Sequence, residues 1–211
     1  MSGHHDDHDH DHAHPAAPEE GAPQGYYQTL EVAVRELLIA KGVITPDALR
    51  RQIEKMDGAH AGRGGQLVAR AWLDPAFKAR ALADGSAAAR ELGLEVGALR
   101  LIVLESTASL HHLVVCTLCS CYPRPLLGLP PDWYKSREYR SRAVREPRAV
   151  LAEFGTIVPD DVEVRVHDST ADMRYLVLPV RPAGTEGWDA ERLARLVTRD
   201  SMIGVARAEA G

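Results

Sequence analysis

The sequence predicts an α+β fold, with helices in the first half of the chain and strands mostly in the second. Apolar residues recur at helical spacing between residues 26 and 98, and short apolar runs follow after residue 100. The two kinds of segment do not alternate as in a doubly wound sheet. The chain has 211 residues, is 45% hydrophobic and carries a net charge of −5. These values are typical of one domain with an appendage.

The composition also excludes several classes of protein. The chain is not basic enough for nucleic acid to be its main partner. No apolar run approaches the roughly 18–20 residues that span a bilayer. The N-terminus is polar and rich in histidine, so it lacks the apolar segment of a secretory signal. We therefore expect a cytoplasmic protein that binds neither nucleic acid nor membrane.

Residues 1–25 are expected to form a low-complexity tail. They contain six of the ten histidines, interleaved with aspartates and followed by prolines and glycines. This composition cannot build a core. Two interpretations remain open, a weak chelator of divalent metal and a solvated tail without a specific ligand. We expect no catalytic residue in this segment.

Residues 26–98 are expected to form a helical N-terminal arm. Thr45-Pro46 and Asp74-Pro75 each begin a helix, because a capping side chain is followed by proline at the first helical position. The glycine-rich segment Gly58–Gly65 lacks the spacing of a phosphate-binding loop, so we interpret it as a connector. The apolar face of the first helix consists of Leu30, Val34, Leu37 and Leu38.

Residues 99–211 are expected to form the metal-binding catalytic domain. Apolar runs or alternating polarity predict four strands there. They are Leu101–Leu104, Leu113–Val115, residues 162–166 and Arg174–Val180. Asp189 caps a last helix. The basic stretch from Lys135 to Arg148 is interpreted as a solvated or subunit-contacting helix face.

The cysteines indicate where the chemistry lies. The chain has three, all between residues 116 and 121, with the spacing Cys-x-x-Cys-Ser-Cys. An odd number in one short cluster is a poor disulfide framework and favours metal or redox chemistry. A structural zinc site needs a fourth ligand, which His111 or His112 can supply, so zinc remains open on this observation. Packed or hydrogen-bonded histidines are the other interpretation of that pair.

The closely spaced Cys119 and Cys121 favour a different metal. Two thiolates one residue apart hold the intervening main-chain amides near the ion. If the amides of Ser120 and Cys121 lose their protons, two nitrogens join three sulfurs to make five donors with one open position. This set suits a small trivalent ion such as Co(III) or Fe(III). An open position is what Lewis-acid catalysis requires.

The motif Cys116–Cys121 resembles the metal-binding motif of the nitrile hydratase α subunit. The resemblance covers roughly residues 26–205 and continues through residues 128–135, 150–155, 162–166, 181–187 and 197–204. It implies a four-layer αββα catalytic domain with an extended N-terminal helical arm. It also implies a heteromeric enzyme whose active site lies at the interface with a β-type subunit. A cobalt-inserting activator protein and a small nitrile are the other partners expected.

The resemblance implies the metal ligands. Cys116 is the axial thiolate, Cys119 is oxidised to sulfinic acid and Cys121 to sulfenic acid. Ser120 and Cys121 also bind through main-chain nitrogen. Thr117 matches the cobalt branch of the family, which implies one Co(III) per chain, with iron as the less favoured alternative.

The resemblance implies further catalytic residues around this set. Cys121 and Ser120 present oxygen atoms to the substrate, and Thr117 lines the pocket. Tyr122, which also matches the cobalt branch, lies behind the ligands. Arg165 is expected either as a buried support for the oxidised sulfurs or as an ordinary strand arginine.

One departure from the family pattern leaves the substrate open. Arg124 stands where common nitrile hydratases have tryptophan, and the thiocyanate hydrolase γ subunit resembles this chain in having arginine there. Arg124 is expected in the substrate pocket, with a solvent or interface position as the alternative. The first hypothesis is a cobalt nitrile hydratase that hydrates a nitrile to the amide, and the second is a thiocyanate hydrolase. A non-enzymatic metal-binding protein is the third, favoured only by the histidine tail and the cysteines.

Overall fold

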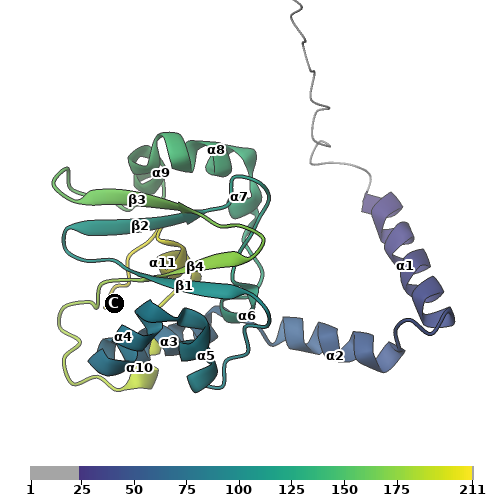
Figure 1. Ribbon diagram of the computed structural model, residues 1–211. Helices are drawn as coiled ribbons and strands as arrows, with labels where there is room; N and C mark the ends of the chain where they lie inside the picture. The colour runs from purple at the N-terminus through teal and green to yellow at the C-terminus, as the bar shows by residue number, and fades with distance from the viewer. Residues whose placement is uncertain (1–23, 211) are drawn as a thin grey trace, which may run out of the picture. The chain divides into compact units, whose positions relative to one another are not determined.

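The computed structural model describes residues 24–210, and Figure 1 shows its elements. The histidine-rich segment lies outside the described residues. Contacts divide the chain into one unit that ends at Arg51 and a larger unit from Gln52 onward. Each unit is described by itself.

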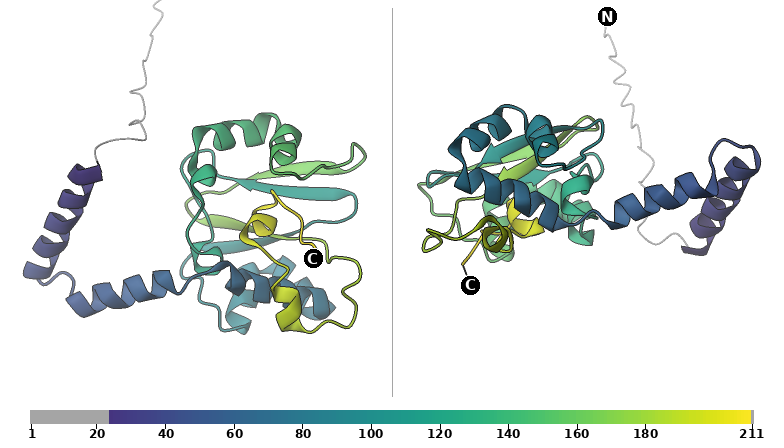
Figure 2. Two further views of the ribbon diagram at one scale, coloured as in Figure 1. Left: turned by 180° about the vertical axis from the view of Figure 1, so that it is seen from behind. Right: turned by 90° about the horizontal axis from the view of Figure 1, so that it is seen from below.

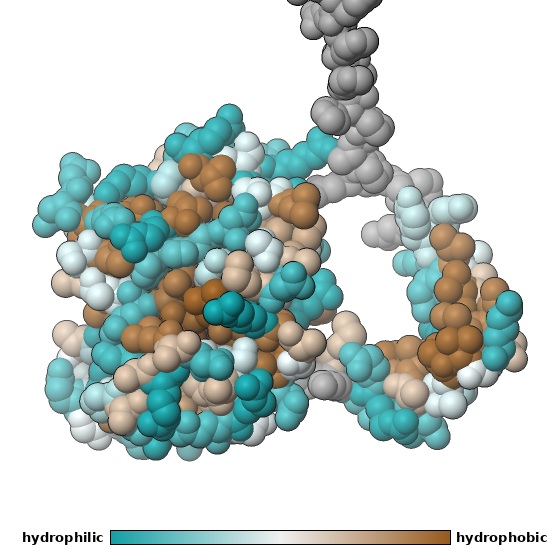
Figure 3. All heavy atoms as spheres, in the orientation of Figure 1, coloured by the Kyte–Doolittle hydropathy of each residue, from teal (hydrophilic) through white to brown (hydrophobic). Residues whose placement is uncertain are grey.

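The first unit contains α1 (Gln24–Ala40) and the beginning of α2 (Pro46–Asp57). Thr45 caps α2 as predicted, because its Oγ1 accepts a hydrogen bond from the Ala48 N–H at 3.1 Å. The apolar face of α1 is uncovered, with Leu30 at 44% and Leu37 at 54% exposure. Figure 3 shows hydrophobic residues, in brown, along this helix.

The four strands found within residues 24–210 all belong to the larger unit, and both pairings are parallel. β1 (Arg100–Glu105) pairs with β4 (Met173–Leu178), and β2 (Leu110–Val115) pairs with β3 (Glu163–Asp168). The strands lie where the sequence predicts them. Because the pairs are parallel, the carboxyl ends of β2 and β3 lie at the same edge, and Val115 is opposite Asp168. This register places residue 116 beside the end of β3.

Helices lie on both sides of the strands (Figures 1 and 2). On one side are α3 (Ala61–Leu73), α4 (Pro75–Ala83), α5 (Gly85–Glu91) and α10 (Ala190–Ala194). On the other are α8 (Arg137–Arg145) and α9 (Pro147–Glu153). The short α6 (Arg124–Leu127), α7 (Asp132–Lys135) and α11 (Arg199–Ile203) complete the fold. This is the mixed helix-and-strand fold that the sequence predicts.

The glycine-rich segment Gly58–Gly65 is not the connector that the sequence predicts. The helix α3 begins at Ala61 and runs through it. A Cβ on Gly64 would lie 2.5 Å from Met202 Sδ, and one on Gly65 would lie 2.9 Å from the Ala194 carbonyl oxygen. These glycines therefore permit close packing of α3 against α10 and α11, which outweighs their low helix propensity.

The core lies between the strands and the flanking helices. Its largest fully buried side chains include Tyr134, Phe77, Leu67 and Leu113. Asp74 begins α4 as predicted, because its Oδ1 accepts hydrogen bonds from the N–H groups of Ala76 and Phe77. Within residues 24–210, the structure contains no helix of the length and apolar character that crossing a membrane requires.

Candidate metal centre

The chain leaves the sheet directly before the cysteines. Val115 is the last residue of β2, and Cys116, which follows it, is fully buried. The cysteine loop, residues 116–121, turns at Leu118, which is 83% exposed, and returns to the buried Cys121. Cys119 lies on the exposed side of the loop. The loop thus carries the thiols from the core to the surface and back.

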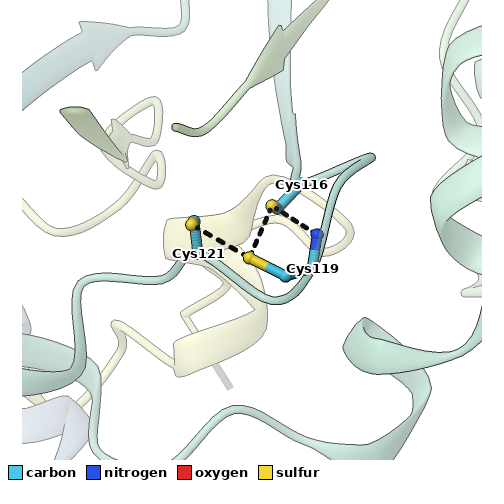
Figure 4. Close-up of side chains that lie close together, drawn as sticks. All are labelled: Cys116, Cys119 and Cys121. Atoms are coloured by element: carbon cyan, nitrogen blue, oxygen red, sulfur yellow. Dashed lines mark hydrogen bonds between the residues drawn. The ribbon is translucent and has the colours of Figure 1, made fainter. Parts of the chain in front are cut away.

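The three thiols form one compact group, the cysteine cluster. The Sγ atoms of Cys116 and Cys119 are 3.7 Å apart, and those of Cys119 and Cys121 are 3.2 Å apart. All three Sγ atoms lie within 4.8 Å of one another, and none is in a disulfide. In Figure 4 the side chains converge from the two arms of the loop. Three sulfurs that converge in this way fit a metal ion that prefers thiolate ligands.

The pKa values of the thiols differ within the cluster. The hydrogen bond from Cys121 lowers the pKa of Cys119, and the N–H groups of Ser120 and Cys121 add to this effect. Burial raises the pKa of Cys121 to about 12, and its hydrogen bonds with Cys119 and Cys116 act in the same direction. The positive charge of Arg174 opposes that rise. A bound cation would favour the thiolate form of all three groups.

Asp168 fixes the first turn of the cysteine loop. Its carboxylate accepts a hydrogen bond from the Thr117 N–H at 2.9 Å and another from the Thr117 hydroxyl at 2.5 Å. The parallel register of β2 and β3 brings these two residues together. Thr117 is therefore held at the cluster by both its backbone and its side chain.

Three side chains from α7 and α8 bind carbonyl groups in and beside the loop. The Tyr139 hydroxyl donates to the Val114 oxygen at 2.6 Å, and the Tyr134 hydroxyl donates to the Cys121 oxygen at 2.9 Å. Arg140 Nη2 donates to the oxygens of Thr117 and Leu118 at 2.9 and 3.0 Å. Burial raises the pKa of both tyrosines, so both remain neutral donors near pH 7.

The other expected pocket residues are placed as follows. Ser120 is half-buried between Cys119 and Cys121. Tyr122 is buried, its hydroxyl donates to the Leu127 oxygen at 3.5 Å, and burial raises its pKa. Ser120 and Tyr122 therefore lie within or directly beside the cysteine loop, and their catalytic roles stay predictions.

Arg165 is exposed in this chain. Its side chain is 51% exposed and forms an ion pair with Glu163 at 2.7 Å. Both residues lie on β3, two positions apart, so both side chains leave the same face of the strand. Its contact with oxidised sulfurs remains a prediction.

Arg124 lies at the start of α6, on an exposed position. It lines a cavity of about 480 Å³ together with Arg63, Glu95 and Leu129. None of the three cysteines contributes to the described lining of this cavity. The structure therefore places Arg124 beside a cavity but does not bring it to the cysteine cluster.

Both strand histidines have partners other than a metal in this fold. His111 Nε2 is 2.7 Å from the Gly204 carbonyl oxygen, and His112 Nδ1 is 2.8 Å from His167 Nε2. Burial lowers the pKa of His111 and His112. They agree with the interpretation of packed, hydrogen-bonded histidines.

Sequence reasoning missed Asp168, Arg140, Tyr134 and Arg174. Asp168 lies two residues after the last of the alternating valines of a predicted strand, but only the parallel pairing shows which loop it meets. Arg140 belongs to the basic stretch interpreted as a solvated or subunit-contacting face. No local sequence pattern separates it from its neighbours, because its role depends on the packing of α8 against β2.

Comparisons with known proteins agree on one family. The family model described as "Nitrile hydratase, alpha chain" matches residues 25–206. The "Low-molecular weight cobalt-containing nitrile hydratase subunit alpha" of Rhodococcus rhodochrous is 53% identical over 178 residues, which are 82% of this chain and 85% of that protein. The "Thiocyanate hydrolase subunit gamma" of Thiobacillus thioparus is 46% identical over 192 residues, which are 85% and 79% of the two chains.

A solved structure is similar in fold as well. A double mutant of the Fe-type nitrile hydratase from Comamonas testosteroni Ni1 aligns with a TM-score of 0.83 and 41% identity, covering 90% of this chain and 93% of that one. The similarity therefore includes cobalt-containing and iron-type relatives.

Proposed function

The chain belongs to the nitrile hydratase alpha-chain family, and from this premise we propose that it is the catalytic subunit of a cobalt nitrile hydratase. The reaction adds water to R–C≡N and gives the amide R–C(O)NH₂. The observation that carries the proposal is the cysteine cluster, whose three Sγ atoms lie within 4.8 Å of one another. Cobalt is proposed over iron because Thr117 and Tyr122 match the cobalt branch and because the relative at 53% identity is named cobalt-containing.

The donor set fits such an ion. The ligands would be the sulfurs of Cys116, Cys119 and Cys121, with the main-chain nitrogens of Ser120 and Cys121. These strong donors suit a small trivalent cation, and the loop geometry already directs the sulfurs toward one point. When bound, the ion supplies Lewis acidity at its open position.

The chain's own residues then act on the substrate. Cys119 is proposed as a sulfinic acid and Cys121 as a sulfenic acid, whose oxygen serves as the nucleophile or base toward the nitrile carbon or water. The hydroxyls of Ser120 and Thr117 line the pocket, and Asp168 fixes the position of the Thr117 hydroxyl. The negative charge of the oxidised sulfurs requires cationic partners, which we expect from arginines of a β-type subunit.

The wider organisation is also part of the proposal. The chain would form a heteromer with a β-type subunit, and its catalytic domain would have the four-layer αββα arrangement. A cobalt-inserting activator protein would load the metal. Residues 1–25 would be a tail, residues 26–98 a helical arm and residues 99–211 the catalytic domain, in a cytoplasmic enzyme.

A second candidate function is thiocyanate hydrolysis. Two observations favour it. The thiocyanate hydrolase γ subunit is expected to have arginine at the position of Arg124, and this chain is 46% identical to such a subunit. A guanidinium group near the pocket attracts an anion, whereas a tryptophan offers an aromatic wall. The side chain at position 124 is therefore expected to influence whether a nitrile or thiocyanate is the preferred substrate.

The test is an assay of the purified heteromer with aliphatic nitriles, aromatic nitriles and thiocyanate, together with elemental analysis. Amide formation with about one cobalt per chain supports the nitrile hydratase proposal. Consumption of thiocyanate without amide formation supports the second candidate. Zinc or several ions per chain without either activity would indicate the metal-binding protein instead.

A further inference from the structure

Arg140 contacts the exposed turn of the cysteine loop, whose first residue, Thr117, is also held by Asp168. Its Nη2 atom donates to the carbonyl oxygens of two successive residues, Thr117 and Leu118, at 2.9 and 3.0 Å. Leu118 is 83% exposed, so the turn itself has little packing to fix it. The hydrogen bonds of the guanidinium group therefore restrain a turn that packing against the core does not restrain.

Two tyrosines on α7 and α8 hold the ends of the same loop by hydrogen bonds. Tyr139 binds the carbonyl of Val114, two residues before Cys116, and Tyr134 binds the carbonyl of Cys121. Both tyrosines are buried, so they hold the two ends of the loop on a rigid base. Between these ends, Arg140 is the side chain from α8 that reaches the residues separating Cys116 from Cys119.

One peptide group links Arg140 to the cluster. The carbonyl of Leu118 accepts from Arg140, and the N–H of the same peptide, which belongs to Cys119, donates to Cys116 Sγ at 3.2 Å. Successive hydrogen bonds through one peptide group polarise and strengthen each other. The orientation of this peptide fixes where Cys119 lies relative to Cys116, whose sulfurs are 3.7 Å apart.

We propose that Arg140 is a positioning residue for the metal centre, which holds the Leu118–Cys119 peptide so that Cys116 and Cys119 converge before the ion arrives. This inference rests on the proposed metal site. The planar group of Arg140 also has a buried Nε atom with no hydrogen-bond partner among the described residues. Burying a donor without a hydrogen-bond partner costs free energy. A surface arginine that served only solubility would not need to be buried in this way.

The test compares variants of one helix. Arg140→Met keeps the length and apolar part of the side chain but removes every donor. Arg145→Met is the matched control, because Arg145 lies on the same α8, is exposed and binds only the Ser141 carbonyl among the contacts described. Arg140→Lys restores a charge and donors with a different geometry. Each variant is prepared as the full chain with its partner subunit, from cells grown without cobalt.

Two measurements do not depend on catalysis. Co²⁺ is titrated into the metal-free protein and followed by the thiolate-to-cobalt charge-transfer absorption. Hydrogen exchange of residues 114–122 is followed by mass spectrometry before any metal is added. For Arg140→Met we expect the Co²⁺ affinity to fall by roughly tenfold or more, as for other residues that orient metal ligands. We also expect the amide hydrogens of the cysteine loop to exchange clearly faster. Arg140→Lys should be intermediate, and Arg145→Met should match the wild type.

The outcomes separate this inference from the proposed function. Wild-type protein that binds no Co²⁺ through its thiols overturns the metal site and the inference together. Wild-type protein that binds Co²⁺, with Arg140→Met binding it equally well, overturns the inference alone. If Arg140→Met lowers the thermal transition of the whole larger unit, Arg140→Gln is the deciding variant, and wild-type affinity in that variant would likewise contradict the positioning role.

Discussion

Cys119 is the central residue of the cysteine cluster. Both of the short sulfur–sulfur separations, 3.7 Å to Cys116 and 3.2 Å to Cys121, involve its Sγ atom. It is also the exposed member of the three and the one whose pKa is lowered by its neighbours. Cys119 is thus exposed to solvent, and its neighbours favour the thiolate form that binds metal ions.

The substitution Cys119→Ala should therefore remove both metal and activity. It deletes one sulfur donor and leaves two that no longer enclose an ion. We expect cobalt per chain to fall to background and activity to fall more than about 100-fold, beyond the loss typical of an outer ligand-orienting residue. Elemental analysis and an amide-formation assay check this. Ser141→Ala, on the exposed face of α8, is the control, and retention of cobalt by Cys119→Ala would contradict the donor set.

Arg124 is proposed to influence the choice of substrate and not the binding of the metal. The residue is exposed, lines the cavity of about 480 Å³ and lies outside the cysteine cluster. Arg124→Trp should shift the ratio of rates toward aromatic nitriles and away from thiocyanate, while cobalt per chain stays unchanged. A substrate panel and metal analysis on the same preparations measure both quantities. Loss of cobalt, or identical rates for every substrate, would show that Arg124 does not form part of the pocket.

The residues of the centre differ in how far the sequence reveals them. The spacing of the three cysteines is local, so the cluster is predictable from the motif alone. Asp168 is 51 residues from its partner Thr117, and Arg140 is 22 residues from Leu118. Their roles follow from strand register and helix packing, which no local pattern encodes. The exposure of Arg165 also follows from tertiary packing, which sets the face of β3 on which it lies, and its expected contact with oxidised sulfurs stays a prediction.

At the scale of elements, the strands were predictable because each has its own apolar run or alternation. Their parallel pairing was not, because the long connections between partners leave the register undetermined. The segment Gly58–Gly65 shows a tertiary effect on propensity. Its glycines predict a loop, yet close contact with Met202 and Ala194 makes them part of α3.

The pair of strands β2 and β3 carries a histidine contact with a consequence for pH. His112 Nδ1 lies 2.8 Å from His167 Nε2, and the rings are 4.8 Å apart between centroids. Burial lowers the pKa of His167 to about 4, and the charges of His112 and Arg165 act in the same direction. The folded protein therefore holds these imidazoles neutral under conditions in which the unfolded chain protonates them.

The free energy of unfolding should fall as the pH falls through this range. Below the unfolded pKa of about 6.5, the unfolded state binds protons that folded His167 does not take up until about pH 4. The stabilising contribution is thus complete above pH 6.5 and is lost between pH 6.5 and 4. Thermal unfolding of the metal-free heteromer at several pH values should show this slope, and His167→Gln should reduce it. Equal slopes in both proteins would contradict the buried-histidine explanation.

At the scale of the whole molecule, the uncovered helix α1 indicates an assembly. Tyr26, Leu30 and Leu37 are 65%, 44% and 54% exposed, although a helix face of this kind is normally covered. The heteromer proposed for this family supplies a covering chain. The mixed helix-and-strand class and the helix α1 were predictable from hydrophobic spacing, whereas a partner that covers α1 depends on a chain outside this sequence.

Limited proteolysis should locate the covered segment. In the isolated chain, trypsin should cut first after Arg35, Arg50 or their neighbours in residues 26–60, because no core protects that backbone. In the heteromer, cleavage there should slow by about tenfold or more as the partner occludes the helix. Rates are compared by mass spectrometry of the fragments, with cleavage in the larger unit as an internal reference. Equal rates at residues 26–60 in both preparations would mean that the arm is not an interface.

The central claim is that Cys116, Cys119 and Cys121 form an oxidised catalytic metal centre. Mass spectrometry of the peptide spanning residues 116–121, taken from active enzyme of known cobalt content, tests it most directly. The account predicts three added oxygen atoms, two on Cys119 and one on Cys121, with Cys116 unmodified. Active, cobalt-loaded enzyme in which all three sulfurs carry no oxygen would contradict it.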